Sequence, residues 1–98
     1  MSLNRKLTPL LLGRIVQSTQ LQGAILEIRF TGDSILRIKT AQPGEIQTWQ
    51  GRTIKRIRQR KTLLLIDFTD GSTLDVTMAE AMSSVMLRDK QGVMEYAD

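Results

Sequence analysis

A run of basic residues, RTIKRIRQRK at positions 52–61, is the most conspicuous chemical feature of the sequence, because six of its ten residues are Arg or Lys. In a strand, Arg56, Arg58 and Arg60 fall on one face and can contact phosphates with little sequence preference. The competing interpretation is an edge strand whose charges prevent aggregation. The nucleic-acid site that we predict comprises Arg52, Lys55, Arg56, Arg58, Arg60, Lys61 and, from a later loop, Met82.

Side chains suited to catalysis or metal binding are scarce. The chain has no His and no Cys, so the usual general base and zinc ligands are missing. Asp33 and Asp70 fall in expected turns, and Glu27, Asp67 and Asp75 fall on outward strand positions, so we assign them turn or surface roles. The serines have no His to activate them, although a Lys remains an alternative general base. We therefore expect no enzymatic activity, no metal and no cofactor.

Length and charge limit the partners. The 98 residues predict a single domain, 1–98,. Residues 1–61 carry 12 basic and 3 acidic groups, for +9, whereas residues 62–98 carry 2 and 7, for −5. A chain polarised in this way can bind an anionic partner or pair with itself. No apolar run is long enough to span a membrane, and the lack of Cys fits a reducing cytosol, so we expect a cytoplasmic protein.

An internal repeat indicates the elements that carry these residues. Segment 13–40 aligns with segment 51–78 at a constant offset of 38 positions, and both begin with Gly-Arg. Each segment contains a strand and then a hairpin, shown by apolar and polar residues that alternate with period two. The first hairpin turns at Gly32-Asp33. The second turns at Asp70-Gly71, a pair typical of a type I′ turn.

Further elements flank the repeat. Thr8-Pro9 predicts the start of a short helix that ends at Gly13. Pro43-Gly44 predicts a turn before a short strand or helical turn at 45–50, and a last hairpin is expected around residues 89–92. The sequence therefore predicts an all-β fold: a two-layer sandwich or flattened barrel of about eight strands, built from two similar meanders, with a short N-terminal helix.

Some strands carry apolar residues on both faces. Leu63 and Leu65 are on the face opposite Leu64 and Ile66 in the second meander, and Ile25 and Ile35 are likewise apolar residues on the outward face of the first. We expect these strands to be buried on both sides. The second cover is either the N-terminal helix, through Leu7, Leu10 and Leu11, or another chain.

The order of these phrases resembles the N-terminal β-domain of the formamidopyrimidine-DNA glycosylase and endonuclease VIII family. LTPLLLGRIV is similar to the opening of that family, and GRTIKRIRQRKTLLL to its middle, with Lys61 at the family's lysine. TLDVTMAEAMSSVMLRD resembles its methionine-bearing loop, with Met82 near the methionine, and GVMEYAD resembles a later phrase. The resemblance implies the β fold and an affinity for DNA.

Departures from the family argue against glycosylase chemistry. Ser2 and Leu3 stand where the family has its Pro nucleophile and Glu, and Thr77 stands near the missing histidine. The 98 residues contain no counterpart of the family's helical DNA-binding region or zinc finger. We therefore expect a small non-catalytic domain that binds DNA or another polyanion weakly. The alternative is a protein-interaction or homo-oligomeric module.

The first prediction follows from these departures. The protein should neither excise oxidised bases nor form a covalent adduct with damaged DNA that borohydride traps, because it lacks the N-terminal Pro amine. Gel analysis of borohydride-treated mixtures measures this adduct. A trapped complex at near-stoichiometric yield would overturn the expectation.

Overall fold

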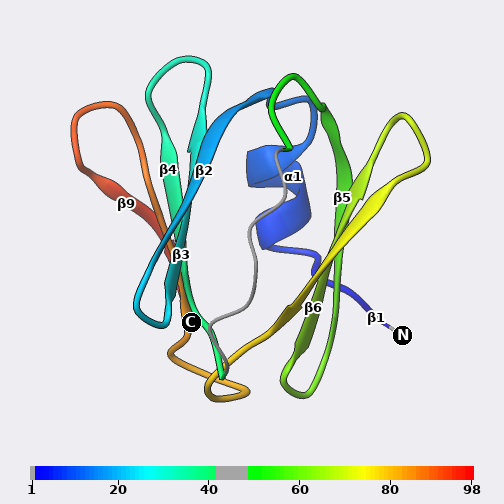
Figure 1. The fold of residues 1–98 in the computed structure, drawn as a ribbon, viewed down its shortest axis with the longest axis vertical. Helices are drawn as coiled ribbons and strands as arrows, with labels where there is room; N and C mark the ends of the chain where they lie inside the picture. The colour runs from blue at the N-terminus through cyan, green and yellow to red at the C-terminus, as the bar shows by residue number, and fades with distance from the viewer. Residues whose placement is uncertain (1, 42–48) are drawn as a thin grey trace.

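The computed structural model describes residues 2–41 and 49–98 and shows an all-β fold with two antiparallel sheets and one short helix (Figure 1). The two sheets face each other as the layers of a sandwich, as the sequence predicts. The turn expected at Pro43-Gly44 lies outside the described residues. So does most of the element expected at 45–50, of which Trp49 and Gln50 are described and lie in no strand.

Within residues 2–41 and 49–98, nine strands form the two layers. The four-stranded sheet has the order β1-β5-β6-β7, with β1 at Ser2–Leu3, β5 at Ile54–Arg60, β6 at Leu63–Phe68 and β7 at Thr73–Thr77. The five-stranded sheet has the order β2-β3-β4-β8-β9, with β2 at Val16–Gln22, β3 at Ile25–Phe30, β4 at Ile35–Lys39, β8 at Val85–Arg88 and β9 at Met94–Ala97. The sequence did not predict β1, which pairs with the edge of β5.

The two meanders, β2–β4 and β5–β7, correspond closely in their pairing. Each first strand has a register shift at its start, between Val16 and Ser18 and between Ile54 and Arg56. Two isolated bridges, Ile15 with Thr53 and Thr40 with Met78, join residues that stand 38 positions apart. The sheets are thus connected at equivalent points of the two meanders. That the two units superpose stays a prediction.

The core fills the space between the sheets. Phe30 and Phe68 are 0% and 2% exposed, and both lie in this core. Alternate residues of the central strands surround them, which is the burial pattern of strands with one inward face. The largest fully buried side chains besides these two are Leu7, Leu11, Ile28, Leu36, Ile38, Ile54, Ile57, Leu64, Ile66 and Met78.

The helix α1, Leu7–Leu11, lies between the two sheets and begins before the expected Thr8 (Figure 1). Lys6 is its N-cap residue, and the Oδ1 of Asn4, two residues before it, accepts hydrogen bonds from the backbone N–H groups of Lys6 and Leu7. Thr8 lies inside the helix, where its hydroxyl donates to the Ile57 carbonyl and accepts from the Ile57 N–H. No helix in the described part of the chain is long and apolar enough to cross a membrane.

Two further expectations need correction. Leu7 and Leu11 are fully buried in the central core, so α1 fills the sandwich and does not cover the outer face of a sheet. Leu65 is nevertheless buried on the outer face of the four-stranded sheet, where it is only 8% exposed. Its register partners there are Arg58 on β5 and Asp75 on β7.

The turn at Asp70-Gly71 is not type I′, because only Gly71 of the two has a positive φ, at +89°,.

The second prediction concerns this core. Substitution Phe68→Ala should lower the free energy of unfolding by about 3–5 kcal/mol, because it removes a buried aromatic side chain and leaves a cavity. Denaturant unfolding measures the change. Leu12→Ala is the control, since Leu12 is 60% exposed and its loss should change stability by about 0.5 kcal/mol or less. Equal losses in the two variants would contradict the assigned core.

Candidate anion-binding surface

Asp67 is the centre of the polar network on the outer face of the four-stranded sheet. Its Oδ2 accepts hydrogen bonds from the Nε of Arg56 at 2.8 Å and the Nε of Arg58 at 2.7 Å. Its Oδ1 accepts from the Nη2 of Arg58 at 2.9 Å and the hydroxyl of Thr73 at 2.7 Å. Arg58 therefore binds the carboxylate with both arms of its guanidinium group, the strongest geometry for this pair. We call these four residues the Asp67 network.

The strand register explains why these side chains meet. Arg56 is directly opposite Asp67 across β5 and β6, and Asp67 is directly opposite Thr73 across β6 and β7. Asp67 is only 6% exposed. The sequence correctly placed Asp67 on the outward face, but its assignment as an ordinary surface group is wrong, because the arginine side chains and Thr73 surround it.

The Asp67 network changes the acidity of its carboxyl group. Desolvation by burial raises the pKa of Asp67, but the hydrogen bonds from Arg58, Arg56 and Thr73 favour the charged form and together prevail,. The pKa of Asp67 is consequently lowered to about 2. The carboxylate thus stays charged at neutral pH, where it compensates half of the charge that Arg56 and Arg58 bring to β5.

The other basic residues of the predicted run do not form one continuous row. Arg52 lies 4.5 Å from the centroid of the Trp49 ring, and its Nε is 3.8 Å from Oδ2 of Asp70. Lys55 is exposed at the register shift of β5, and Arg60 is exposed at the end of that strand. Lys61 occupies the following turn with a φ of +53°. The structure therefore leaves Lys55, Arg60 and Lys61 most accessible.

Met82 lies in the loop between β7 and β8 and is 69% exposed. The loop is connected to β5 by a long hydrogen bond from the Gln59 side-chain Nε2 to the Ala81 carbonyl, at 3.4 Å. Met82 is therefore available for an apolar contact, as the sequence predicts for an adaptable loop methionine. Its place in the nucleic-acid site stays a prediction.

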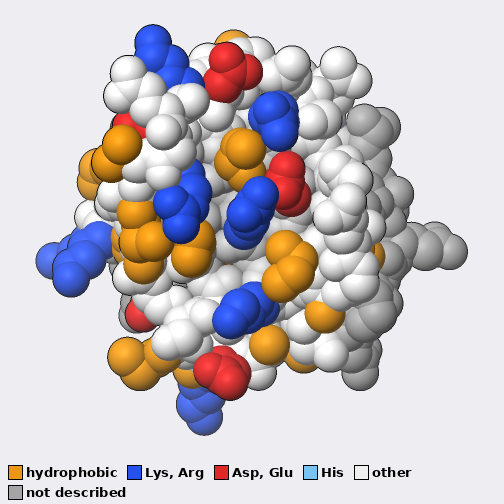
Figure 2. All heavy atoms as spheres, turned by 90° about the vertical axis from the view of Figure 1, so that its left-hand side faces the viewer, with side chains coloured by type: hydrophobic (Ala, Val, Ile, Leu, Met, Phe, Trp, Pro, Cys, Tyr) orange, Lys and Arg blue, Asp and Glu red, His pale blue; other side chains and the backbone are white. Residues whose placement is uncertain are grey.

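A second basic surface lies on the outer face of the five-stranded sheet. Leu26, Leu36 and Leu87 point into the core, so their neighbours along the same strands point outward. The outward residues of β3, β4 and β8 form what we call the basic sheet face: Ile25, Glu27, Arg29, Ile35, Arg37, Lys39, Met86 and Arg88. On the side of the molecule that this sheet occupies, basic side chains lie among hydrophobic ones (Figure 2).

The basic sheet face has a clear excess of positive charge. It holds four cations and one acid, for 4 − 1 = +3. Glu27 is shared by two arginines, since its carboxylate oxygens lie 3.1 Å from Nε of Arg37 and 3.7 Å from Nη2 of Arg29. The side chains of those arginines remain 52% and 44% exposed. One carboxylate thus holds two guanidinium groups while leaving them open to solvent.

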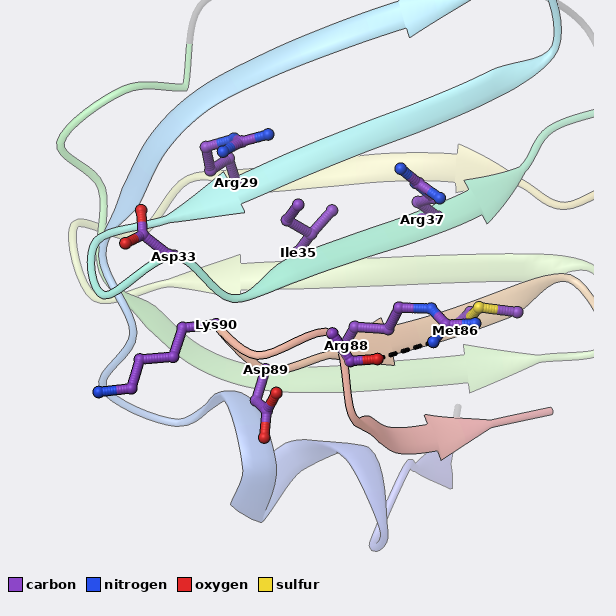
Figure 3. A pocket seen from close by; sticks show the side chains of 9 residues that line it. Arg29, Asp33, Ile35, Arg37, Met86, Arg88, Asp89 and Lys90 are labelled. Carbon is purple, nitrogen blue, oxygen red and sulfur yellow. Dashed lines mark hydrogen bonds between the residues drawn. The ribbon is translucent and has the colours of Figure 1, made fainter.

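A groove of about 560 Å³ crosses one end of this face. Arg29 and Arg37 line it together with Ile35, and Arg88 closes it from β8 (Figure 3). The Nη1 of Arg88 donates a 2.8 Å hydrogen bond to the Gly92 carbonyl, which holds this side chain toward the β8–β9 turn. Asp33, Asp89 and Lys90 also line the groove, so the lining includes two carboxylates. The groove offers several guanidinium groups to one anion.

A second groove, of about 710 Å³, lies on the neighbouring part of the same face. Arg37 and Met86 line both grooves, and Lys39 and Ile25 extend the lining toward β3 and β4. Glu27 and Asp98 also contribute to it. The surface therefore combines cations with apolar side chains over three adjacent strands.

The described residues do not suggest metal chemistry. Residues 2–41 and 49–98 contain no group of three or more His, Cys, Asp or Glu side chains that could hold a metal ion. The guanidinium and ammonium groups on the two sheet surfaces are of the kind that binds phosphate or carboxylate groups.

Sequence reasoning missed the basic sheet face, although part of its signal was visible. Arg29, Arg37 and Lys39 are outward residues of the first predicted hairpin. The sequence analysis did not predict that β8 pairs with β4, a pairing that sets Arg88 directly opposite Ile35. No local pattern predicts that pairing, because β8 is separated from β4 by the whole second meander.

Comparisons with known protein families, curated proteins and solved structures found no significant match to this chain.

The third prediction tests the Asp67 network. Substitution Asp67→Asn should lower the free energy of unfolding at pH 7 by about 1–3 kcal/mol, because it removes charge-assisted hydrogen bonds from a buried group. The pKa of Asp67 is lowered from 3.8 to about 2, so its contribution is complete above about pH 4 and is lost as the pH falls toward 2. The two proteins should therefore converge in acid.

Asp75→Asn is the matched control, since Asp75 is an exposed residue on the same face and its loss should change stability by about 0.5 kcal/mol or less. Urea unfolding at several pH values between 2 and 7 gives both curves. A stability difference for Asp67→Asn that stays constant across this range would contradict the lowered pKa.

Proposed function

We propose that this domain is a non-catalytic module that binds the phosphate backbone of a nucleic acid through the basic sheet face. The observation that carries the proposal is the +3 excess of charge on three adjacent strands. Backbone phosphates are the anions that such a row of cations matches, and binding needs no contact with the bases. The net charge of +4 and the isoelectric point near 10.0 favour the approach of any polyanion,.

The basic strand that the sequence singles out takes a secondary part in this proposal. Arg56 and Arg58 are held by Asp67, so a phosphate that recruits them must compete with a carboxylate at 2.7–2.8 Å. Arg29 and Arg37 share one carboxylate at the longer distances of 3.7 and 3.1 Å, although their side chains, 44% and 52% exposed, are about as accessible as that of Arg56 at 47%. A phosphate can therefore recruit Arg29 and Arg37 more easily than Arg56 and Arg58.

Resemblance to the glycosylase family supports the proposal in a limited way. The order of phrases in the sequence is similar to that of a DNA-binding domain, whereas the residues needed for base excision are missing. Binding without catalysis fits both facts. The membership of the chain in that family, its cytoplasmic location and its lack of enzymatic activity stay predictions.

The competing proposal is a protein-interaction or homo-oligomeric module. The observation that favours it is a set of exposed hydrophobic side chains near the C-terminus, where Met82, Val93 and Met94 are 69%, 57% and 44% exposed. Such residues are adaptable contact groups at protein interfaces. In this case the basic sheet face meets the acidic surface of a partner protein.

The fourth prediction separates the two basic surfaces. If three or four phosphates are contacted, the slope of log K against log salt on duplex DNA should be around −3 to −4, from about −0.9 for each phosphate. The double variant Arg37→Gln with Lys39→Gln should flatten this slope by nearly two units. The matched control, Arg60→Gln with Lys61→Gln, removes the same charge from the other sheet and should change the slope much less.

Fluorescence anisotropy with an arbitrary labelled duplex at several salt concentrations measures both slopes. A larger effect of the Arg60 and Lys61 control would return the site to the basic strand. Absence of binding at about 0.1 M salt with micromolar protein would overturn the nucleic-acid proposal, because a site with several phosphate contacts binds duplex non-specifically in that range. The interaction module would then be favoured.

A further inference from the structure

Among residues 2–41 and 49–98, no strand pairs with the outer edge of β7, whereas the equivalent edge of β4 is paired with β8. In the five-stranded sheet, β4 pairs with β3 on one side and β8 on the other. In the four-stranded sheet, β7 occupies the corresponding place beside β6, and no strand in the described part of the chain pairs with its other side. β7 is the yellow strand of the right-hand sheet in Figure 1.

The hydrogen-bonding groups of this edge can be assigned. The Met78 N–H donates to the Thr62 carbonyl, so Met78, Val76 and Leu74 direct their backbone groups toward β6, and the residues between them direct theirs outward. The Thr77 carbonyl already accepts a hydrogen bond from the Ala41 N–H. Within the part of the chain that the structure describes, the groups left for a further strand are therefore the outward N–H and C=O groups of Thr73 and Asp75, together with the Thr77 N–H.

We propose that the open edge of β7 binds an extended segment of another protein as an additional antiparallel strand, with a cationic side chain opposite Asp75. Addition of a strand to an exposed sheet edge is a general mode of peptide recognition. The pairing of β8 with β4 supplies the template, because β4 and β7 occupy equivalent positions 38 residues apart. The proposal is independent of the basic sheet face, which lies on the other sheet.

The template sets the residue type at each position of the segment. Val85, Met86, Leu87 and Arg88 pair with Ile38, Arg37, Leu36 and Ile35 in that order. The equivalent residues of β7 are Val76, Asp75, Leu74 and Thr73. Apolar residues are therefore expected opposite Val76 and Leu74, whose side chains face the core. A Lys or Arg is expected opposite Asp75, because opposite charges stabilise a cross-strand pair.

Pairing of β7 with the β7 strand of a second copy is less favourable than its pairing with the proposed segment. A two-fold pairing centred on Asp75 places two carboxylates directly opposite each other, which is destabilising. A pairing centred on Val76 extends to Met78, whose outer side already bridges to Thr40. A pairing centred on Leu74 extends into the turn at Gly71. The proposal therefore commits to a partner of apolar and basic alternation and not to a second copy.

Titration of the ¹⁵N-labelled protein with the hexapeptide Thr-Val-Lys-Leu-Arg-Thr tests the proposal. We expect saturable binding, and we expect the Thr73 and Asp75 amides to gain protection from hydrogen exchange. A peptide with Glu in place of Lys should bind about tenfold more weakly, since it sets like charges opposite each other. The variant Asp75→Lys should reverse this preference, and if it does not fold, Asp75→Asn should abolish the difference between the peptides.

Backbone pairing has its own matched control. The Lys39 N–H donates to the Ser84 carbonyl, so in the template the residues at positions 84, 86 and 88 direct their backbone groups toward β4. N-methylation of the peptide at Lys should consequently abolish binding, whereas N-methylation at Leu, which faces away from β7, should be tolerated.

Three results would overturn the proposal. They are no saturable binding at millimolar peptide, equal effects of the two N-methyl groups, and a free protein that is already dimeric with protected Thr73 and Asp75 amides. The last result would show that the edge is self-paired. Loss of DNA binding alone would leave this proposal standing, because the two sites are on different sheets.

Discussion

The contact between Asp67 and two arginines decides how this small domain distributes its charge. Arg56 and Arg58 are adjacent outward residues of β5, and their mutual repulsion on one strand is relieved by a carboxylate that accepts hydrogen bonds from both. Without it, two guanidinium groups would lie side by side over a sheet whose outer face also buries Leu65. The interaction lets a strongly basic strand occupy an interior position of its sheet, and it also reduces the capacity of that strand to bind phosphate.

The two meanders use equivalent positions for opposite purposes. Asp67 and Asp75 of the four-stranded sheet correspond, 38 positions earlier, to Arg29 and Arg37 of the five-stranded sheet. The four-stranded sheet consequently has two carboxylates for the three outward arginines of β5. The five-stranded sheet has one carboxylate for four cations, over two grooves. The same asymmetry extends to the edges, since β8 covers β4 and leaves β7 without an equivalent neighbour among the described residues. Similar scaffolds thus provide one surface suited to anions and one edge suited to a strand.

Local patterns in the sequence predicted most of the fold. Period-two alternation located the strands of both meanders, and the final hairpin around residues 89–92 was also found, because each depends on neighbouring residues. The helix start predicted at Thr8 was wrong, because the helix begins at Leu7, whose N–H donates to the side chain of Asn4. Thr8 lies inside the helix and its hydroxyl contacts β5. The site was predicted less well. The two-residue turn after Arg60 fixes the register that brings Arg56 opposite Asp67. The contact between these two residues could therefore be derived from the sequence. The position of Arg88 beside β4 could not, because it depends on the pairing of two strands that are far apart in the sequence.

The most direct measurement is the site of first contact with a polyanion, observed at the arginine side chains themselves. The Nε–Hε signals of the ¹⁵N-labelled protein can be followed while a short duplex of arbitrary sequence is added at low salt. If Asp67 holds the arginines of β5, the signals of Arg29, Arg37 and Arg88 should shift first, and those of Arg56 and Arg58 should stay nearly constant. Early shifts confined to Arg56 and Arg58 would contradict the central role that we assign to Asp67.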